Sequence, residues 1–256
     1  MHAARSRLLL LAVAVIAAAC GTKFDVKKYQ GNNDELWRIS LREFTRHNWD
    51  DAVQGFEKLT LDLPAHDSLL SRSYFYLAQA HEHKGEYLLA AQSYSRLAES
   101  FPDDTLADQS LYRAGRAYER MWRRPDLDAQ YGEQALSSFQ QLVTLYPGAK
   151  TAPSGQREIT HLQEWFALKD YKTGAHYLKR GAYDSAIIYF KDVLKNYPTT
   201  ATARLASLRL VDAYRKIKYQ DDANDVCAQL RTQYPSDREV QQRCGVATTA
   251  TRPSSP

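Results

Sequence analysis

Small, aromatic and proline residues recur at a fixed spacing beyond residue 34. In each repeat an alanine precedes an aromatic residue (once a cysteine) by four positions, and a proline follows eight positions later. The five sets are Ala52/Phe56/Pro64, Ala90/Tyr94/Pro102, Ala135/Phe139/Pro147, Ala186/Phe190/Pro198 and Ala223/Cys227/Pro235. Because positions i and i+4 share a helix face and proline disfavours continuation, each set predicts an amphipathic helix that ends before its proline.

A second amphipathic segment lies upstream of each of these helices, so the repeating unit is helix–turn–helix. This pattern is the tetratricopeptide repeat (TPR) signature. The proline intervals of 38, 45, 51 and 37 residues exceed the 34 of the consensus and predict longer connections. We place an insertion at about 123–130 and a long first helix at about 152–180. The predicted fold is all-α, an α-solenoid of five TPR units and about ten helices.

The N-terminal segment predicts export and lipid attachment. Basic residues Arg5 and Arg7 precede an apolar run over 8–19, which is too short to span a bilayer and is typical of a signal peptide. The run ends in Ala17-Ala18-Ala19-Cys20, which resembles the bacterial lipobox, so Cys20 is the predicted lipidation site; the alternative is an ordinary signal peptide with an incidental cysteine. We expect a signal peptide at 1–19, a lipidated Cys and flexible tether at 20–33, the repeats at 34–244, and a disordered tail at 245–256.

Composition excludes several classes of protein. The chain of 256 residues is 44% hydrophobic and 25% charged, which suits a packed globular body and not a disordered one. After removal of the leader, 32 Lys and Arg face 30 Asp and Glu, so no basic excess indicates nucleic-acid binding.

Catalysis finds no support in the sequence. There is no nucleophile-elbow, phosphate-loop or dinucleotide motif. The triplet His81-Glu82-His83 lacks the zinc-protease spacing, and residues two apart on a helix point about 200° from each other, so both histidines cannot face one metal. We expect no enzyme activity, no metal and no cofactor.

The first helices of TPR units line the concave groove, which gives candidate binding residues. A groove that combines aromatic rings with arginine suits an aromatic-containing peptide with a terminal carboxylate. The candidates are Trp37, Phe44, Arg72, Phe75, Gln79, Tyr112 and Arg116. Alternatively, Trp37 and Phe44 simply pack the first repeat, and Arg72 and Arg116 belong to a solvated face. In the fifth unit, Asp212, Arg215 and Lys216 hold equivalent positions and are candidates for contact with a polar partner.

Two cysteines remain once Cys20 is acylated. Cys227 and Cys244 would lie in an oxidising compartment, where a disulfide forms readily. One interpretation is a bridge, with residues 237–244 folding back as a cap. The other is that Cys227 is a buried apolar residue and Cys244 is a free thiol.

The lipobox, the five repeats and two further stretches resemble the BamD family, the lipoprotein subunit of the outer-membrane β-barrel assembly machine. The stretches are 35–52, from Glu35-Leu36-Trp37 to Asn48-Trp49-Asp50-Asp51-Ala52, and 176–198, which begins His176-Tyr177-Leu178-Lys179-Arg180-Gly181. The similarity covers about 33–235. It implies a scaffold anchored to the outer membrane and facing the periplasm. The C-terminal repeats would bind a POTRA domain of a BamA-like insertase, and the N-terminal repeats would receive unfolded β-barrel proteins.

Three functions therefore compete at this point. The first is assembly of outer-membrane β-barrel proteins, with contacts to the insertase, to substrates and to other assembly lipoproteins. The second is an adaptor that recruits peptidoglycan hydrolases or other envelope proteins through the same groove. The third is a structural lipoprotein that grips peptidoglycan, although no sugar-binding domain is recognisable. We favour the first.

Overall fold

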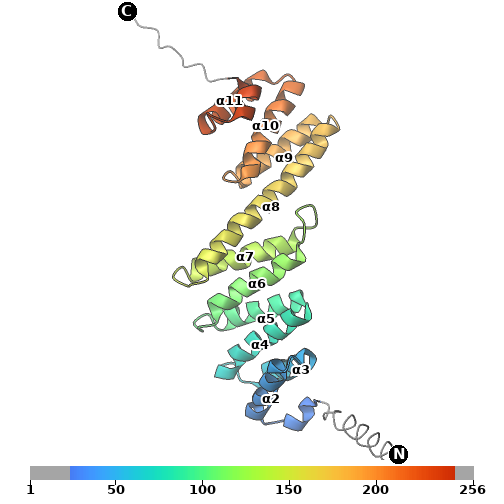
Figure 1. Ribbon diagram of the computed structural model, residues 1–256, viewed down its shortest axis with the longest axis vertical. Coiled ribbons are helices and arrows are strands. Elements are labelled where there is room, and N and C mark those ends of the chain that lie inside the picture. Colours follow the sequence, from blue (N-terminus) through green and yellow to red (C-terminus); the bar gives the residue numbers. More distant parts are fainter. Residues whose placement is uncertain (1–23, 246–256) are drawn as a thin grey trace, which may run out of the picture. The chain divides into compact units, whose positions relative to one another are not determined.

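The computed structural model describes residues 24–245, and every regular element among them is helical (Figure 1). This confirms the predicted all-α class. In chain order the elements are η1 (Val26–Tyr29), α2 (Asn33–Thr45), α3 (Trp49–Asp62), α4 (Ser68–Lys84), α5 (Tyr87–Ser100), α6 (Ala107–Met121), α7 (Gln130–Leu145), α8 (Ala152–Lys179), α9 (Tyr183–Asn196), α10 (Ala201–Lys216), α11 (Gln220–Gln233) and α12 (Arg238–Cys244). The described residues form two compact units, divided between Glu86 and Tyr87, which we describe separately.

The repeated residues occupy the positions that their spacing predicts. The five alanines have no exposed surface, and the residues four positions later are at most 1% exposed. The second helix of each pair, α3, α5, α7, α9 and α11, ends two residues before its proline. The spacing therefore predicts both the buried face and the end of each of these helices.

The first unit packs α2 against α3, and α3 against α4. Leu36, Phe56 and Leu59 are fully buried in its core. The short helix η1 also contacts α2 and α3, and a Cβ on Gly55 would lie 3.3 Å from the Phe24 ring. The folded body therefore begins before residue 33, where the predicted tether ends, because Phe24 and η1 lie against the helices.

The second unit is built around α8, the 28-residue helix that the sequence places at about 152–180. In Figure 1 its N-terminal part runs beside α7 and its C-terminal part beside α9. Glu164, near its middle, accepts hydrogen bonds from the backbone N–H groups of Ala201 (2.9 Å) and Thr202 (3.1 Å) and so caps the start of α10. One continuous helix therefore supports the helix pairs on both sides of it.

Two glycines allow large rings to enter between helices of the second unit. A Cβ on Gly115 of α6 would lie 2.7 Å from the Phe139 ring, and one on Gly174 of α8 would lie 2.8 Å from the Phe190 ring. Both rings are fully buried. The small residues thus permit the close helix approach that an aromatic core position requires.

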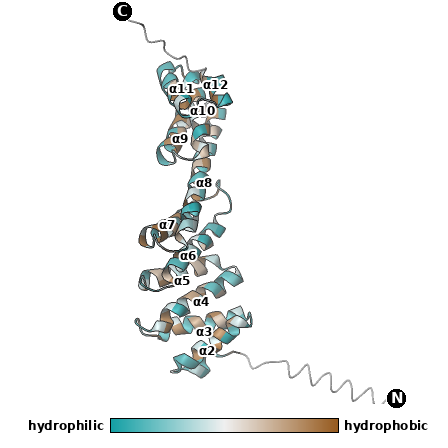
Figure 2. Ribbon diagram, turned by 60° about the vertical axis from the view of Figure 1, so that its left-hand side comes forward, coloured by the Kyte–Doolittle hydropathy of each residue, from teal (hydrophilic) through white to brown (hydrophobic). Residues whose placement is uncertain are grey.

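Hydrophobic and hydrophilic residues are interspersed along the helices (Figure 2). At helical spacing this gives a helix one face for the core and one face for the solvent. Among residues 24–245, no helix combines the length and apolar character that crossing a bilayer demands. Of the insertion expected at 123–130, residues 123–129 lie in the non-helical connection between α6 and α7, and Gln130 begins α7.

Candidate protein-binding surfaces

An aromatic surface covers α2, α3 and α4 in the first unit. We define it by five half-buried or exposed rings: Trp37, Phe44, Trp49, Tyr76 and His83. The first two and Tyr76 contact the buried Phe56, and the other two join them through Phe44. Its ring centroids lie close together, with Trp37 5.7 Å from Tyr76 and Phe44 5.2 Å from Tyr76. Such edge-to-face contacts stabilise ring positions beyond the burial of area. The surface is therefore both rigid and accessible.

Trp49 and His83 extend this surface with a parallel stack. Their ring centroids are 4.2 Å apart and their planes differ by 4°. Phe44 lies 5.2 Å from Trp49 and joins the stack to the rings of α2 and α4. Trp49 does not belong to the predicted groove, because it begins a second helix and the prediction considered first helices alone.

On α4, the stripe of residues that faces the aromatic surface contains Tyr76 in place of the predicted Phe75. Arg72, Tyr76, Gln79 and His83 follow the spacing i, i+4, i+7, i+11 and share one face of the helix. Phe75 lies about one sixth of a turn around the helix axis from Arg72, and it is only 8% exposed. Tyr76 therefore takes the surface position expected for Phe75. Among the described residues the Arg72 guanidinium makes no ion pair and is exposed.

Tyr112 and Arg116, the other predicted groove residues, belong to a charge network between α6 and α8 in the second unit. Arg116 Nη1 donates to Glu119 Oε2 at 2.8 Å and to Glu158 Oε1 at 3.0 Å. The Tyr112 hydroxyl donates to the same Glu158 oxygen at 3.4 Å. His161 Nε2 lies 3.7 Å from Glu119 Oε1. Arg116 is therefore occupied by two carboxylates of its own chain, and it is not the free guanidinium that a terminal carboxylate requires.

Burial raises the pKa of Glu119, and the nearby Arg116 guanidinium opposes that shift. Burial also raises the pKa of the Tyr112 hydroxyl, and the charge of Glu158 adds to the effect. The two carboxylates outnumber the one arginine, so the network is anionic when His161 is neutral.

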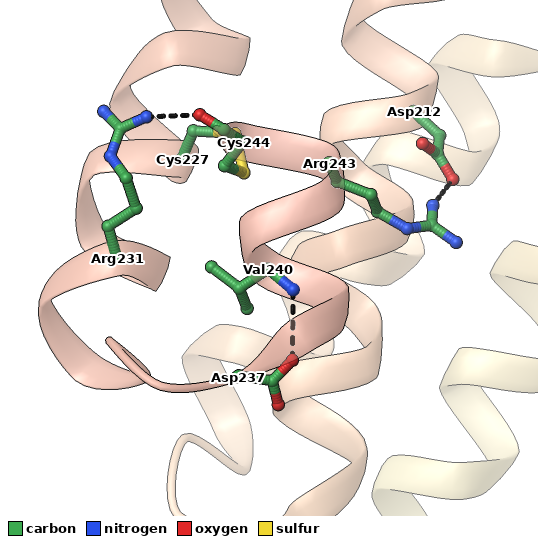
Figure 3. The surroundings of a disulfide bond; sticks show 7 residues. All are labelled: Asp212, Cys227, Arg231, Asp237, Val240, Arg243 and Cys244. Atoms are coloured by element: carbon green, nitrogen blue, oxygen red, sulfur yellow. Dashed lines mark hydrogen bonds and ion pairs between the residues drawn. A yellow bond between two sulfur atoms is a disulfide. The ribbon is translucent and has the colours of Figure 1, made fainter. Parts of the chain in front are cut away.

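The three predicted partner-binding residues of α10 separate into two roles. Asp212 accepts hydrogen bonds from Arg209, at 3.4 Å, and from Arg243 of α12 (Figure 3). It thus holds the last helix in place. Arg215 and Lys216 are exposed in the last turn of α10 and make no ion pair among the described residues. They are the two that remain open to a partner.

A disulfide joins Cys227 of α11 to Cys244 at the end of α12 (Figure 3), with 5.2 Å between the Cα atoms. The Asp237 carboxylate caps α12 by accepting from the N–H of Val240 at 3.0 Å, and Val240 is 1% exposed. Arg231 donates to the backbone oxygen of Cys244 at 2.6 Å. Residues 237–244 therefore fold back over α11, and of the two interpretations of the cysteines the structure contains the bridge.

The two histidines of the triplet at 81–83 lie in different surroundings. His81 is buried, with its Nδ1 2.7 Å from Glu86 Oε2, whereas His83 stacks on Trp49. In the part of the chain that the structure describes, no three His, Cys, Asp or Glu side chains are grouped as metal ligands would be. The predicted lipidation site, Cys20, lies outside the described residues.

Comparison with known proteins gives one consistent result. The family described as "YfiO: Outer membrane lipoprotein" matches residues 29–230. A Caulobacter vibrioides protein named "Outer membrane protein assembly factor BamD" is 28% identical over 239 residues, which cover 91% of this chain and 78% of that protein. Proteins of the same name from Neisseria gonorrhoeae and Rickettsia prowazekii are 24% and 21% identical. The matches cover 89% and 90% of this chain, and 91% of each relative.

Proposed function

The chain belongs to the YfiO family of outer membrane lipoproteins, and from this premise we propose that it is a non-enzymatic helical scaffold for outer-membrane protein assembly. The observation that carries the proposal is the extent of the match, because residues 29–230 include α2 to α10 and most of α11. The relatives are named for assembly. An adaptor for peptidoglycan hydrolases gains no support from them.

We propose that Cys20 carries the lipid that anchors the protein to the outer membrane, with the helical body facing the periplasm. The sequence of the leader supports this, and acyl chains alone can hold a folded body at a bilayer surface. The Cys20→Ala variant is expected to move from the membrane fraction to the soluble periplasmic fraction. Continued sedimentation of the variant with outer membranes in high salt would contradict the anchor, or would mean that partner binding replaces it.

Unfolded β-barrel substrates are proposed to bind the aromatic surface of α2–α4. Its rigid rings can contact aromatic side chains of an extended segment with little ordering cost. Arg72 is exposed on the same stripe as Tyr76, and its unpaired guanidinium can form a bidentate pair with a terminal carboxylate. The surface therefore suits a C-terminal segment that is rich in aromatic residues.

A BamA-like insertase is proposed to dock through its POTRA domain on the C-terminal helix pairs, where Arg215 and Lys216 of α10 are exposed. Other lipoproteins of the assembly complex are further proposed partners. Asp212 is left out of this contact, because it is already paired with Arg243. Arg116 is left out of substrate binding for the corresponding reason.

A crossed titration tests the two binding surfaces. Arg72→Glu is expected to weaken binding of a barrel-derived peptide with a free C-terminus by about ten-fold, and to leave POTRA binding unchanged. The Arg215→Glu/Lys216→Glu double variant is expected to show the reverse. A peptide with an amidated C-terminus is the matched control, because it should bind wild type and Arg72→Glu equally.

Two results would contradict this division. Equal loss of both ligands in both variants, at an unchanged melting temperature, would mean that the chain has one binding surface. If Arg72→Glu lowers the affinity of the amidated peptide as much as that of the free peptide, Arg72 does not bind the terminal carboxylate.

A further inference from the structure

A polar cavity of about 400 Å³ lies among α5, α6 and α7 of the second unit. Its volume falls in the range of about 300–1,000 Å³ that is usual for ligand sites. The buried side chains of Tyr118 and Ser138 form its floor, and exposed residues of α5 and α7 form its rim. None of the residues assigned above to substrate or partner binding lines it.

The lining of this cavity accepts hydrogen bonds and carries negative charge. Glu99 of α5 and Glu133 of α7 contribute carboxylates, and Gln130 and Gln134 contribute amides. Within the described residues, none of these four side chains forms a hydrogen bond or an ion pair. The nine residues that line the cavity include no lysine, arginine or histidine, so none of them supplies a cation to the two carboxylates.

Each of the two carboxylates affects the pKa of a nearby tyrosine hydroxyl. Burial raises the pKa of the Tyr118 hydroxyl at the floor, and the charge of Glu99 raises it further. Burial raises the pKa of the Tyr197 hydroxyl likewise, with added effects of Asp170 and Glu133. Because the two carboxylates line the same cavity, a cation there would enter a region of negative potential.

We propose that this cavity binds an arginine side chain that a partner protein presents, with its guanidinium held by Glu99 and Glu133. Arginine fits better than lysine, because its planar group has five donors for acceptors spread over two helices, whereas an ammonium is a compact point charge. The surrounding amide and hydroxyl oxygens accept the remaining donors. The site adds a protein contact to the scaffold and does not depend on where substrate binds.

The test is an NMR titration of the isotopically labelled protein with a capped Gly–Arg–Gly peptide. The control peptide carries citrulline, which has the shape of arginine without its charge. The arginine peptide is expected to shift the side-chain amide signals of Gln130 and Gln134 in a saturable way. Glu99→Gln and Glu133→Gln are each expected to weaken binding about five-fold, and the double variant by more than ten-fold.

Asp225→Asn is the matched control variant, since it removes one exposed carboxylate on α11 that does not line the cavity; its affinity should equal that of wild type. Both Glu→Gln replacements keep side-chain shape at exposed positions, and an unchanged melting curve verifies the folding of each variant. Equal binding of the citrulline peptide would overturn the proposal in favour of a neutral hydrogen-bonding ligand, such as a saccharide. Equal binding of a lysine peptide, or undiminished binding by the double variant, would also overturn it.

Discussion

Removal of the Cys227–Cys244 disulfide is expected to destabilise the C-terminal end of the repeats. The bridge spans 17 positions of sequence. In the chain-entropy description, a loop of that length restricts the unfolded chain by about 3 kcal/mol. The Cys244→Ser variant should lose this amount while keeping Cys227 buried, so no core cavity is added.

Other contacts decide where the loss appears. Val240 is buried against the cluster of α10 and α11, Asp212 pairs with Arg243, and Arg204 lies 3.1 Å from Asp237. These contacts keep α12 docked in the variant, but each of these half-buried surface pairs contributes only about 1 kcal/mol. Because repeat proteins unfold in parts, we expect α10–α12 to open first and the earlier helices to melt as in wild type.

Urea unfolding followed by circular dichroism, with hydrogen exchange at the Val240 amide, measures both effects. The amide should exchange faster in Cys244→Ser by a factor that corresponds to the loss in stability. Addition of reductant should bring wild type to the level of the variant and leave the variant unchanged. Mass spectrometry after alkylation without reductant is the decisive check. Two labelled thiols from Cys227 and Cys244 in the folded protein would refute the reasoning.

Two further predictions concern the charge network and the packing of the second unit. Arg116→Ala should lower the free energy of unfolding by about 1 kcal/mol at pH 7. The variant lacks the guanidinium that pairs with both Glu119 and Glu158, so the two carboxylates repel each other. Because the pKa of Glu119 is raised, its contribution to stability is present at low pH and is lost as pH rises through that pKa. The loss of stability in Arg116→Ala should therefore be smaller when melting is measured at pH 5. An equal or larger loss at pH 5 would contradict this. Gly174→Ala should cost about 1–3 kcal/mol by thermal melting, since its Cβ meets the buried Phe190 ring, whereas Gly148→Ala has open space and should cost little. Equal effects of the two alanines would mean that the contact with the Phe190 ring does not set the cost at Gly174.

The helix ends and the buried faces follow from the sequence by itself. Ala186 and Phe190 lie on one face because the α-helix repeats every 3.6 residues, and α9 ends at Asn196 because Pro198 disfavours further helix. The same local rules predict the long helix α8. Such features depend on neighbours in the chain, so spacing alone is sufficient.

The tertiary structure decided which charged groups are free to bind a partner. Arg116 is paired with Glu158, 42 residues away, and Asp212 with Arg243, 31 residues away, whereas Arg72 and Arg215 remain unpaired among the described residues. Spacing places each of these side chains on a helix face, but which charged group lies opposite it depends on how two helices pack against each other. Pairing across helices therefore cannot be derived from the period of one helix.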